Sequence, residues 1–331
     1  MKRRTTLQLV ALMLASPGRA LAQTPRRFRI GFLWVANEAT VKPVAEAFLA
    51  GLRDLGYVEG RNIVVDMRYA GGDTSRLPAL ADEQIALKPD VLLGLESPAS
   101  VIRTKTKTIP IVLTASVDPL AYGLVQSLAR PGTNVTGMSY RLDQLLAKHI
   151  ELLSELVPKL SRVALLNYAA VTNDPDARLA ARYEQFAKMA AAAKGLSLIV
   201  VSARDPEGVR QAFAALERER PGGVVVPSTG PMFQLRHEII SHARRLRLPT
   251  ISWFPPAWAE AGGLVTYGPN AIESHRYAAT YVDRILKGAK PAELPIEQPT
   301  KFEFVVNLKT AREIGIKIPR SILLRADRVI E

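Results

Sequence analysis

The chain of 331 residues has no cysteine. It therefore has no disulfide framework, no thiol nucleophile and no cysteine that could carry a lipid. Histidine is also scarce, since only His149, His237, His242 and His275 occur, and their spacing is not that of metal ligands. The sequence predicts no metal site and no cofactor.

Catalytic motifs are missing as well. No strand is followed by a G-x-S-x-G elbow, a G-x-G-x-x-G turn or a phosphate-binding G-x-x-x-x-G-K-[ST] loop. Gly71-Gly72 and Gly262-Gly263 are typical of turns. We therefore expect no catalytic residues and a protein that binds a molecule without transforming it.

The first 22 residues have the order of a signal peptide. Lys2, Arg3 and Arg4 precede an apolar segment, residues 7–15, that is too short to span a bilayer, and Ala20-Leu21-Ala22 suits a cleavage site. We expect cleavage after Ala22 and a periplasmic protein with no lipid anchor and no stable membrane insertion. Arg3-Arg4 fits a twin-arginine signal poorly, so both that route and general secretion stay open.

The formal net charge is +13. A basic balance of this size can indicate a nucleic-acid partner. Here the basic residues, such as Arg178, Arg182, Arg244 and Arg245, are scattered along expected helices without interleaved aromatics. This pattern predicts solvated helix faces and no nucleic-acid partner.

Apolar runs and amphipathic segments alternate along the whole chain, which predicts an α/β fold of two doubly wound, Rossmann-like lobes. In the first half, strands are expected at 28–35, 62–70, 91–95, 109–114 and 134–139, and helices at 44–55, 76–87, 98–106 and 119–130. In the second half, strands are expected at 162–168, 196–203, 222–228 and 249–254, and helices at 142–157 and 176–194. A further helix is expected later in the chain, at 271–288.

Two expected strands of the first half end in small and acidic residues. The run LLGL leads into Glu96-Ser97-Pro98, and IPIVLT leads through Ser116 into Asp118-Pro119. Ligands of open α/β sheets bind beyond the carboxyl ends of the strands, where unpaired N–H groups are available. Ser97 and Asp118 are equally suited to capping the helices that follow, and capping does not exclude contact with a ligand.

Long segments of the sequence resemble the ABC transporter substrate-binding protein family of the tryptophan/tyrosine type. They are Gly123–Gly137, Ala261–Asn270, Tyr281–Pro319 and Leu323–Asp327, within a resemblance that runs from about Arg29 to the end of the chain. It implies a type I periplasmic binding fold, with a ligand held between two lobes that are joined by three crossover segments. The expected lobes are 27–138 plus 265–297 and 139–264 plus 298–331.

The resemblance also implies a set of ligand-binding residues at strand ends. They are Trp34, Asn37, Ser97, Ser116, Asp118, Asn167, Tyr168, Thr229 and Trp253, with Glu96 as an added carboxylate. Trp34, Tyr168 and Trp253 either stack on a planar ligand or fill the core and the hinge.

Two departures from the family pattern bear on the ligand. Relatives often have Thr-Pro where this chain has Glu96-Ser97-Pro98, and Asp-Pro where it has Ser228-Thr229-Gly230. Because Thr229 replaces an acid that would suit an ammonium group, we expect an aromatic or branched organic acid, or an amide, in preference to a free amino acid. Glu96 or Asp118 could supply the missing acid instead.

These features predict a monomeric periplasmic receptor that delivers a small organic molecule to an ABC permease with its cytoplasmic ATPase. Two alternatives share the fold class: an exported ligand-sensing module and an exported hydrolase that uses Asp118 or Glu96. The expected signal peptide and the lack of an N-terminal helix-turn-helix argue against a repressor-like module. The missing pair of base and nucleophile argues against the hydrolase.

Overall fold

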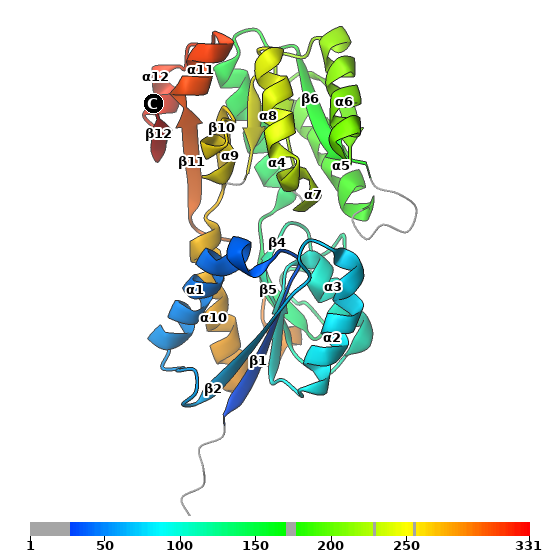
Figure 1. The fold of residues 1–331 in the computed structure, drawn as a ribbon, viewed down its shortest axis with the longest axis vertical. Helices are drawn as coiled ribbons and strands as arrows, with labels where there is room; N and C mark the ends of the chain where they lie inside the picture. The colour runs from blue at the N-terminus through cyan, green and yellow to red at the C-terminus, as the bar shows by residue number, and fades with distance from the viewer. Residues whose placement is uncertain (1–26, 170–176, 228–229, 254–255) are drawn as a thin grey trace, which may run out of the picture.

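A computed structural model describes residues 27–169, 177–227, 230–253 and 256–331. The expected signal peptide, 1–22, lies outside these residues. The chain forms two α/β lobes, each built around its own open sheet (Figure 1). This is the fold class that the alternation of strands and helices predicts.

The first lobe contains a parallel five-stranded sheet in the order β2-β1-β3-β4-β5. Its strands are β1 Phe28–Trp34, β2 Ile63–Tyr69, β3 Val91–Gly94, β4 Ile111–Ser116 and β5 Val135–Ser139. Its helices are α1 Glu38–Asp54, η1 Thr74–Arg76, α2 Leu77–Ala86, α3 Glu96–Lys105, α10 Ala271–Leu286 and η2 Pro291–Glu293. As the sequence indicates, β2 lies at an edge.

Helices cover both faces of this sheet because successive side chains of a strand point to opposite faces. Ile30 and Phe32 of β1 pack in one core with α1 and α10. Leu33 packs in a second core with α2 and α3. A strand buried on both faces is apolar along its buried residues, which is why residues 30–34 lack the alternation of a surface strand.

The second lobe contains a seven-stranded sheet in the order β12-β11-β10-β9-β8-β6-β7, parallel except for the pair β10–β11. Its strands are β6 Arg162–Tyr168, β7 Ser197–Ala203, β8 Val224–Val225, β9 Thr250–Ser252, β10 Val265–Pro269, β11 Phe302–Asn307 and β12 Arg328–Ile330. Its helices are α4 Leu142–Leu156, α5 Ala177–Ala193, α6 Pro206–Glu219, α7 Gly230–Gln234, α8 Arg236–Arg245, α9 Ala257–Glu260, α11 Leu308–Ile314 and α12 Arg320–Leu323.

Three segments connect the lobes: the β5–α4 connection, the β10–α10 connection, and residues 297–301 before β11. Residues 265–269, expected in the first lobe, form β10 of the second sheet, where all five pair with β11. The second crossing therefore lies at Asn270. Its N–H donates to the carbonyl of Lys301 (3.2 Å), so the second and third crossings run side by side.

Residues 119–130, expected as a helix, form a series of turns. Gly123 has a φ of 62°, in the left-handed region, which ends any helical turn that begins at Pro119. Thr133 Oγ1 then donates to the Leu124 carbonyl (2.8 Å), and the Ser127 hydroxyl donates to the Arg130 carbonyl (2.9 Å). In this segment, hydrogen bonds from side chains to backbone carbonyls take the place of the backbone hydrogen bonds of a helix.

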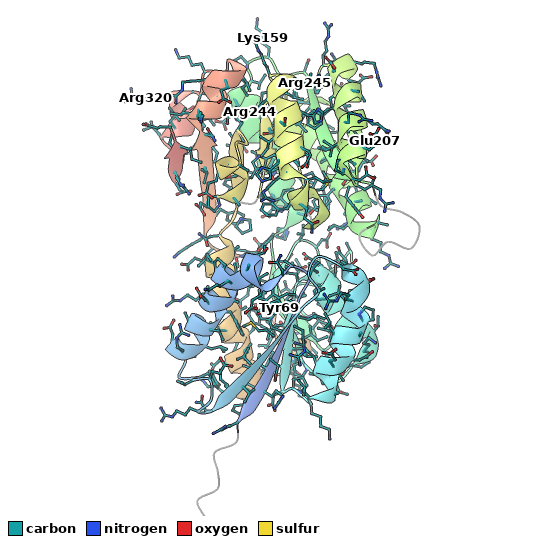
Figure 2. The ribbon with its side chains drawn as sticks, in the orientation of Figure 1. Tyr69, Lys159, Glu207, Arg244, Arg245 and Arg320 are labelled. Carbon is teal, nitrogen blue, oxygen red and sulfur yellow. The ribbon has the colours of Figure 1, made fainter. Side chains whose placement is uncertain are left out.

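Basic side chains are spread over the second lobe. Figure 2 shows Lys159, Arg244, Arg245 and Arg320 at the end of this lobe that is distant from the first lobe. Arg244 is paired with Glu313. Within the described residues, no helix has both the length and the apolar character that crossing a membrane requires.

Candidate ligand-binding site

The two lobes meet through the segment that follows β4. Asp118 Oδ2 accepts a hydrogen bond from Arg182 Nε of α5, at 2.9 Å, so a carboxylate of the first lobe pairs with a guanidinium of the second. Val117 and Tyr122 pack against the core of the second lobe, and Tyr122 also packs against a core of the first. The carboxyl end of the first sheet therefore faces the second lobe.

Asp118 also organises its own segment. It is almost fully buried, with 6% of its surface exposed, and its Oδ1 accepts from the N–H groups of Leu120 (3.1 Å) and Ala121 (3.0 Å). This is the capping geometry expected of Asp118, although turns take the place of the helix. Both oxygens are thus engaged within the protein.

Glu96 connects the two strand ends that the sequence singles out. It is the first residue of α3, and its Oε1 accepts the backbone N–H of Val117, directly after β4. The adjacent Ser116 hydroxyl is fully buried and has no hydrogen-bond partner among the described residues. The carboxylate of Glu96 therefore accepts the backbone donor that follows β4, and a buried hydroxyl occupies the last position of the strand.

Tyr140, in the first crossing, extends this group toward the hinge. Burial, followed by the negative charge of Glu96, raises the pKa of its phenol, and its side chain hydrogen-bonds Ser274 of α10. Ser274 Oγ donates in turn to the carbonyl of Asn270 (2.9 Å). Sequence reasoning missed Tyr140, Ser274 and Arg182, because their contacts join segments that are distant in the chain.

In the second lobe, Asn167 and Tyr168 lie at the end of β6, as expected. Asn167 Nδ2 donates to the carbonyl of Ala180 in α5 (2.8 Å), and its Oδ1 accepts the N–H of Tyr168 (2.9 Å). Asn167 thus holds α5 against β6, and α5 carries Arg182. Tyr168 is half-buried at the edge of a second-lobe core.

The two expected tryptophans pack inside the lobes. Trp34 is 2% exposed and stacks on Phe32, with ring centroids 3.9 Å apart, and on His275 of α10. Trp253 is also 2% exposed and stacks on Tyr183 and on His149 of α4. This packing is the core-filling alternative considered for both residues.

The remaining expected residues contribute less to the described geometry. Asn37 is exposed and caps α1 by accepting the N–H of Thr40 (2.9 Å). Ser97 lies inside the first turn of α3, after Leu95 as the cap residue, and therefore does not cap this helix. Thr229 lies outside the described residues.

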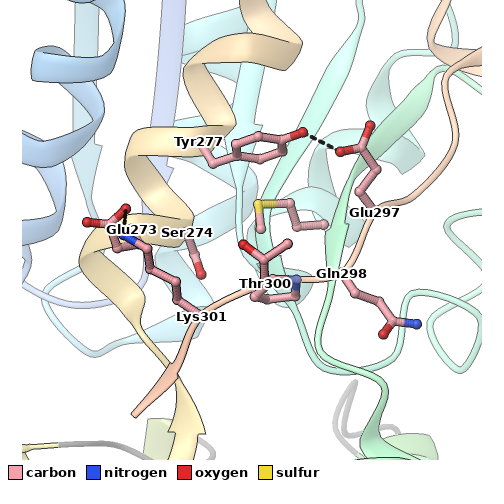
Figure 3. A pocket seen from close by; sticks show the side chains of 9 residues that line it. Glu273, Ser274, Tyr277, Glu297, Gln298, Thr300 and Lys301 are labelled. Carbon is pink, nitrogen blue, oxygen red and sulfur yellow. Dashed lines mark hydrogen bonds and ion pairs between the residues drawn. The ribbon is translucent and has the colours of Figure 1, made fainter. Parts of the chain in front are cut away.

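A pocket of about 120 Å³ lies at the hinge, between α10 and the third crossing (Figure 3). Tyr277 donates to Glu297, and Lys301 Nζ pairs with Glu273 at 3.4 Å. The hydrogen bond to Glu297 is the main cause that raises the pKa of Tyr277. These contacts connect the third crossing to α10, so the pocket belongs to the hinge between the lobes.

No group of three or more histidine, aspartate or glutamate residues is placed to hold a metal ion in the described part of the chain. The groups at the lobe interface are hydrogen-bond donors and acceptors on both sides. Such an arrangement can bind a small polar molecule.

Two α/β lobes, three crossings and strand ends directed at the opposite lobe define the class of type I periplasmic binding proteins. The chain belongs to the ABC transporter substrate binding protein family, whose model matches residues 33–330. It is accordingly a protein that binds a small-molecule solute.

The chain is also similar to individual proteins and to solved structures. The chain is 24% identical over 290 residues to a tyrosine-binding protein of Clostridioides difficile (strain R20291), covering 87% of this chain and 81% of that protein. It is similar to the structure of a conserved domain protein from Vibrio cholerae (26% identity, TM-score 0.82; 92% and 100% covered). It also resembles an ABC domain in complex with L-Trp from Streptococcus pneumonia (23% identity, TM-score 0.79; 92% and 100% covered).

Proposed function

We propose that this protein is an exported, monomeric receptor that delivers a small aromatic or branched carboxylate, amide or amino acid to an ABC permease with its cytoplasmic ATPase. Export rests on the signal-peptide pattern of residues 1–22. The ligand class rests on similarity to a tyrosine-binding protein and to a domain crystallised with L-Trp. Lobe closure around the solute is the transport signal.

One observation carries the proposal: Asp118, just after β4 of the first lobe, pairs with Arg182 of α5 in the second lobe. We propose that a solute held between the lobes contacts Glu96, Ser97, Ser116, Asn167 and Tyr168, and the family resemblance adds Trp34, Asn37, Thr229 and Trp253 to this set. The two carboxylates accept hydrogen bonds from backbone N–H groups or from arginine, which suits binding and leaves neither as a free base. We therefore propose no enzymatic activity.

A ligand screen tests this function. Freshly purified protein is analysed by native mass spectrometry for retained ligand and then screened by thermal shift against tyrosine, tryptophan, leucine and their deaminated acids and amides. A ligand present at ~1,000 times its dissociation constant should stabilise the protein by about 4 kcal/mol.

We expect at least one aromatic or branched member to stabilise the fold and to be recovered chemically unchanged. Stabilisation by none of them would contradict the proposed ligand class. Recovery of a hydrolysed product would favour the enzyme alternative.

A further inference from the structure

We propose that the end of the second lobe distant from the first lobe is a basic docking surface, by which the protein adsorbs reversibly to an anionic lipid membrane. The inference goes beyond the proposed function. It draws on that function only for its setting, since an exported receptor without a lipid anchor works beside the membrane that holds its permease.

Sheet topology gathers basic side chains at this end. Strands β6, β8 and β9 are parallel, so the connections that enter them lie at one end of the sheet. Lys159 precedes β6, and Arg220 precedes β8. Arg245 and Arg247 precede β9. Figure 2 shows Lys159, Arg245 and Arg320 at the end distant from the first lobe. These five residues define what we call the basic pole.

The charges of the basic pole are exposed and uncompensated. All five side chains are exposed, and none of them forms an ion pair with another described residue. The acidic side chains that form pairs near this end do so with other arginines: Glu155 with Arg325, Glu219 with Arg162 and Glu313 with Arg244. The exposed Glu217 has Arg218 beside it in the sequence. A surface with this excess of positive charge attracts the headgroups of anionic lipids.

Three members of the basic pole have a backbone conformation that suits glycine. The φ angle is 60° at Lys159, 48° at Arg220 and 51° at Arg247, in the left-handed region. A side chain is disfavoured there because its Cβ crowds the following carbonyl oxygen, whereas glycine adopts the conformation readily. Glycine would therefore serve the local fold better at these positions. What lysine and arginine add there is charge at the surface.

An exposed leucine beside the basic pole favours a lipid membrane over a nucleic acid. Leu324 is 76% exposed and directly follows α12, which begins at Arg320. The next residue, Arg325, pairs with Glu155 in the last turn of α4, so Leu324 lies near the connection that carries Lys159. Basic side chains beside an exposed apolar one are typical of surfaces that lie at the boundary of headgroups and acyl chains. Binding to a nucleic-acid backbone depends on the charges alone.

Co-sedimentation with lipid vesicles can test the inference. The chain is used from Gln23 onward, which keeps every described residue and omits the apolar segment 7–15. The vesicles contain phosphatidylcholine alone or with about one third phosphatidylglycerol, at about 0.1 M salt. The variants are Lys159→Gly, Arg220→Gly and Arg247→Gly, singly and combined. Each removes one charge and relieves a left-handed side-chain residue, so the fold should be kept.

Lys88→Gly is the matched control. Lys88 is also exposed, follows a helix and has a φ of 52°, but it lies after α2 in the first lobe. The substitution therefore makes the same change in charge and backbone freedom away from the basic pole. A second variant, Leu324→Ser, tests the apolar contact.

We expect binding to the anionic vesicles and none to phosphatidylcholine alone. A basic residue near an anionic surface raises the partition coefficient about fivefold, so each single variant should bind about fivefold and the triple variant about a hundredfold more weakly. Lys88→Gly should bind like the wild-type chain, and Leu324→Ser should bind roughly tenfold more weakly. About 1 M salt, at which the Debye length is about 3 Å, should abolish binding.

Three results would contradict the inference. Absence of binding to anionic vesicles would overturn the docking surface, and so would equal weakening by Lys88→Gly and by the single variants of the basic pole. Tighter binding to a DNA duplex than to vesicles, lost in the triple variant but kept in Leu324→Ser, would replace the lipid by a nucleic acid. Solute binding is measured separately by thermal shift, so a chain that binds solute but no vesicles leaves the proposed function standing.

Discussion

Two buried histidines occupy corresponding places in the two lobes. Each lies on a helix that follows a crossing, and each ring stacks on a tryptophan at a strand end: His275 on Trp34 (5.5 Å between centroids) and His149 on Trp253 (5.7 Å). Both donate a ring N–H to a backbone carbonyl. Burial lowers the pKa of each imidazole to about 4.

This pKa shift predicts how stability depends on pH. In the unfolded chain each imidazole takes up a proton below about pH 6.5, whereas in the folded protein it stays neutral down to about pH 4. The contribution of each neutral, buried imidazole to the free energy of unfolding is therefore complete above about pH 6.5 and is lost as the pH falls toward about 4. Each histidine can account for about 3 kcal/mol over this window.

Urea unfolding between pH 7.5 and 4 would measure this effect. His275→Gln should be less stable at pH 7.5 but should lose less stability on acidification. The exposed His237 provides the control, since His237→Gln should keep the wild-type slope. The same slope in His275→Gln would contradict the assignment.

At the scale of elements, α10 is the helix by which the C-terminal part of the chain packs into the first lobe. It follows the second crossing and packs against α1, to which Gly51 allows a close approach. A Cβ atom added at Gly51 would lie 2.3 Å from the carbonyl oxygen of Arg276 and 3.0 Å from the Cβ of Ala279. Any side chain at this position would force the helices apart.

We therefore expect Gly51→Ala to destabilise the protein by about 1–3 kcal/mol. The clash should outweigh the ~1 kcal/mol by which alanine favours a helix over glycine. Chemical denaturation measures the change. Glu46→Ala, at an exposed position of the same helix, should change stability by less than about 0.5 kcal/mol. Unchanged or higher stability of Gly51→Ala would refute the close α1–α10 packing.

At the scale of the whole molecule, the Asp118–Arg182 pair joins the lobes away from the three crossings. Arg182→Gln should shift the equilibrium toward separated lobes, because it removes the cross-lobe charge and leaves the Asp118 capping bonds intact. For a partly exposed pair we expect about 1 kcal/mol, or roughly fivefold in the ratio of open to closed forms.

Small-angle scattering of the ligand-free protein should show a larger radius of gyration for Arg182→Gln. Raising the salt to 1 M should move the wild-type chain in the same direction, since the Debye length falls to about 3 Å. Arg325→Gln, which breaks a pair with Glu155 inside the second lobe, should leave the radius unchanged. No increase for Arg182→Gln would show that this pair does not bias closure.

Much of this architecture could be predicted from the sequence. Buried runs such as RVALLNY end where β6 ends, and the amphipathic spacing of residues 142–157 gives α4 to within one residue. Local periodicity determines such elements because the spacing of apolar residues along the chain reflects whether one face or both faces are buried. The segments from Gly123 to Asp327 that resemble the family also indicated the family, to which the chain belongs.

Tertiary structure alone decided which polar groups meet. Arg182 and Asp118 are 64 residues apart in the sequence. The position of Arg182 on α5 would equally suit an arginine exposed to solvent. The sheet that β10 joins, the packing of Trp34 and Trp253 inside the lobes, and the capture of the Val117 N–H by Glu96 all depend on how segments distant in the chain approach each other. Periodicity predicts the end of a strand, but the partner of a side chain at that end is set by the packing of the folded lobes.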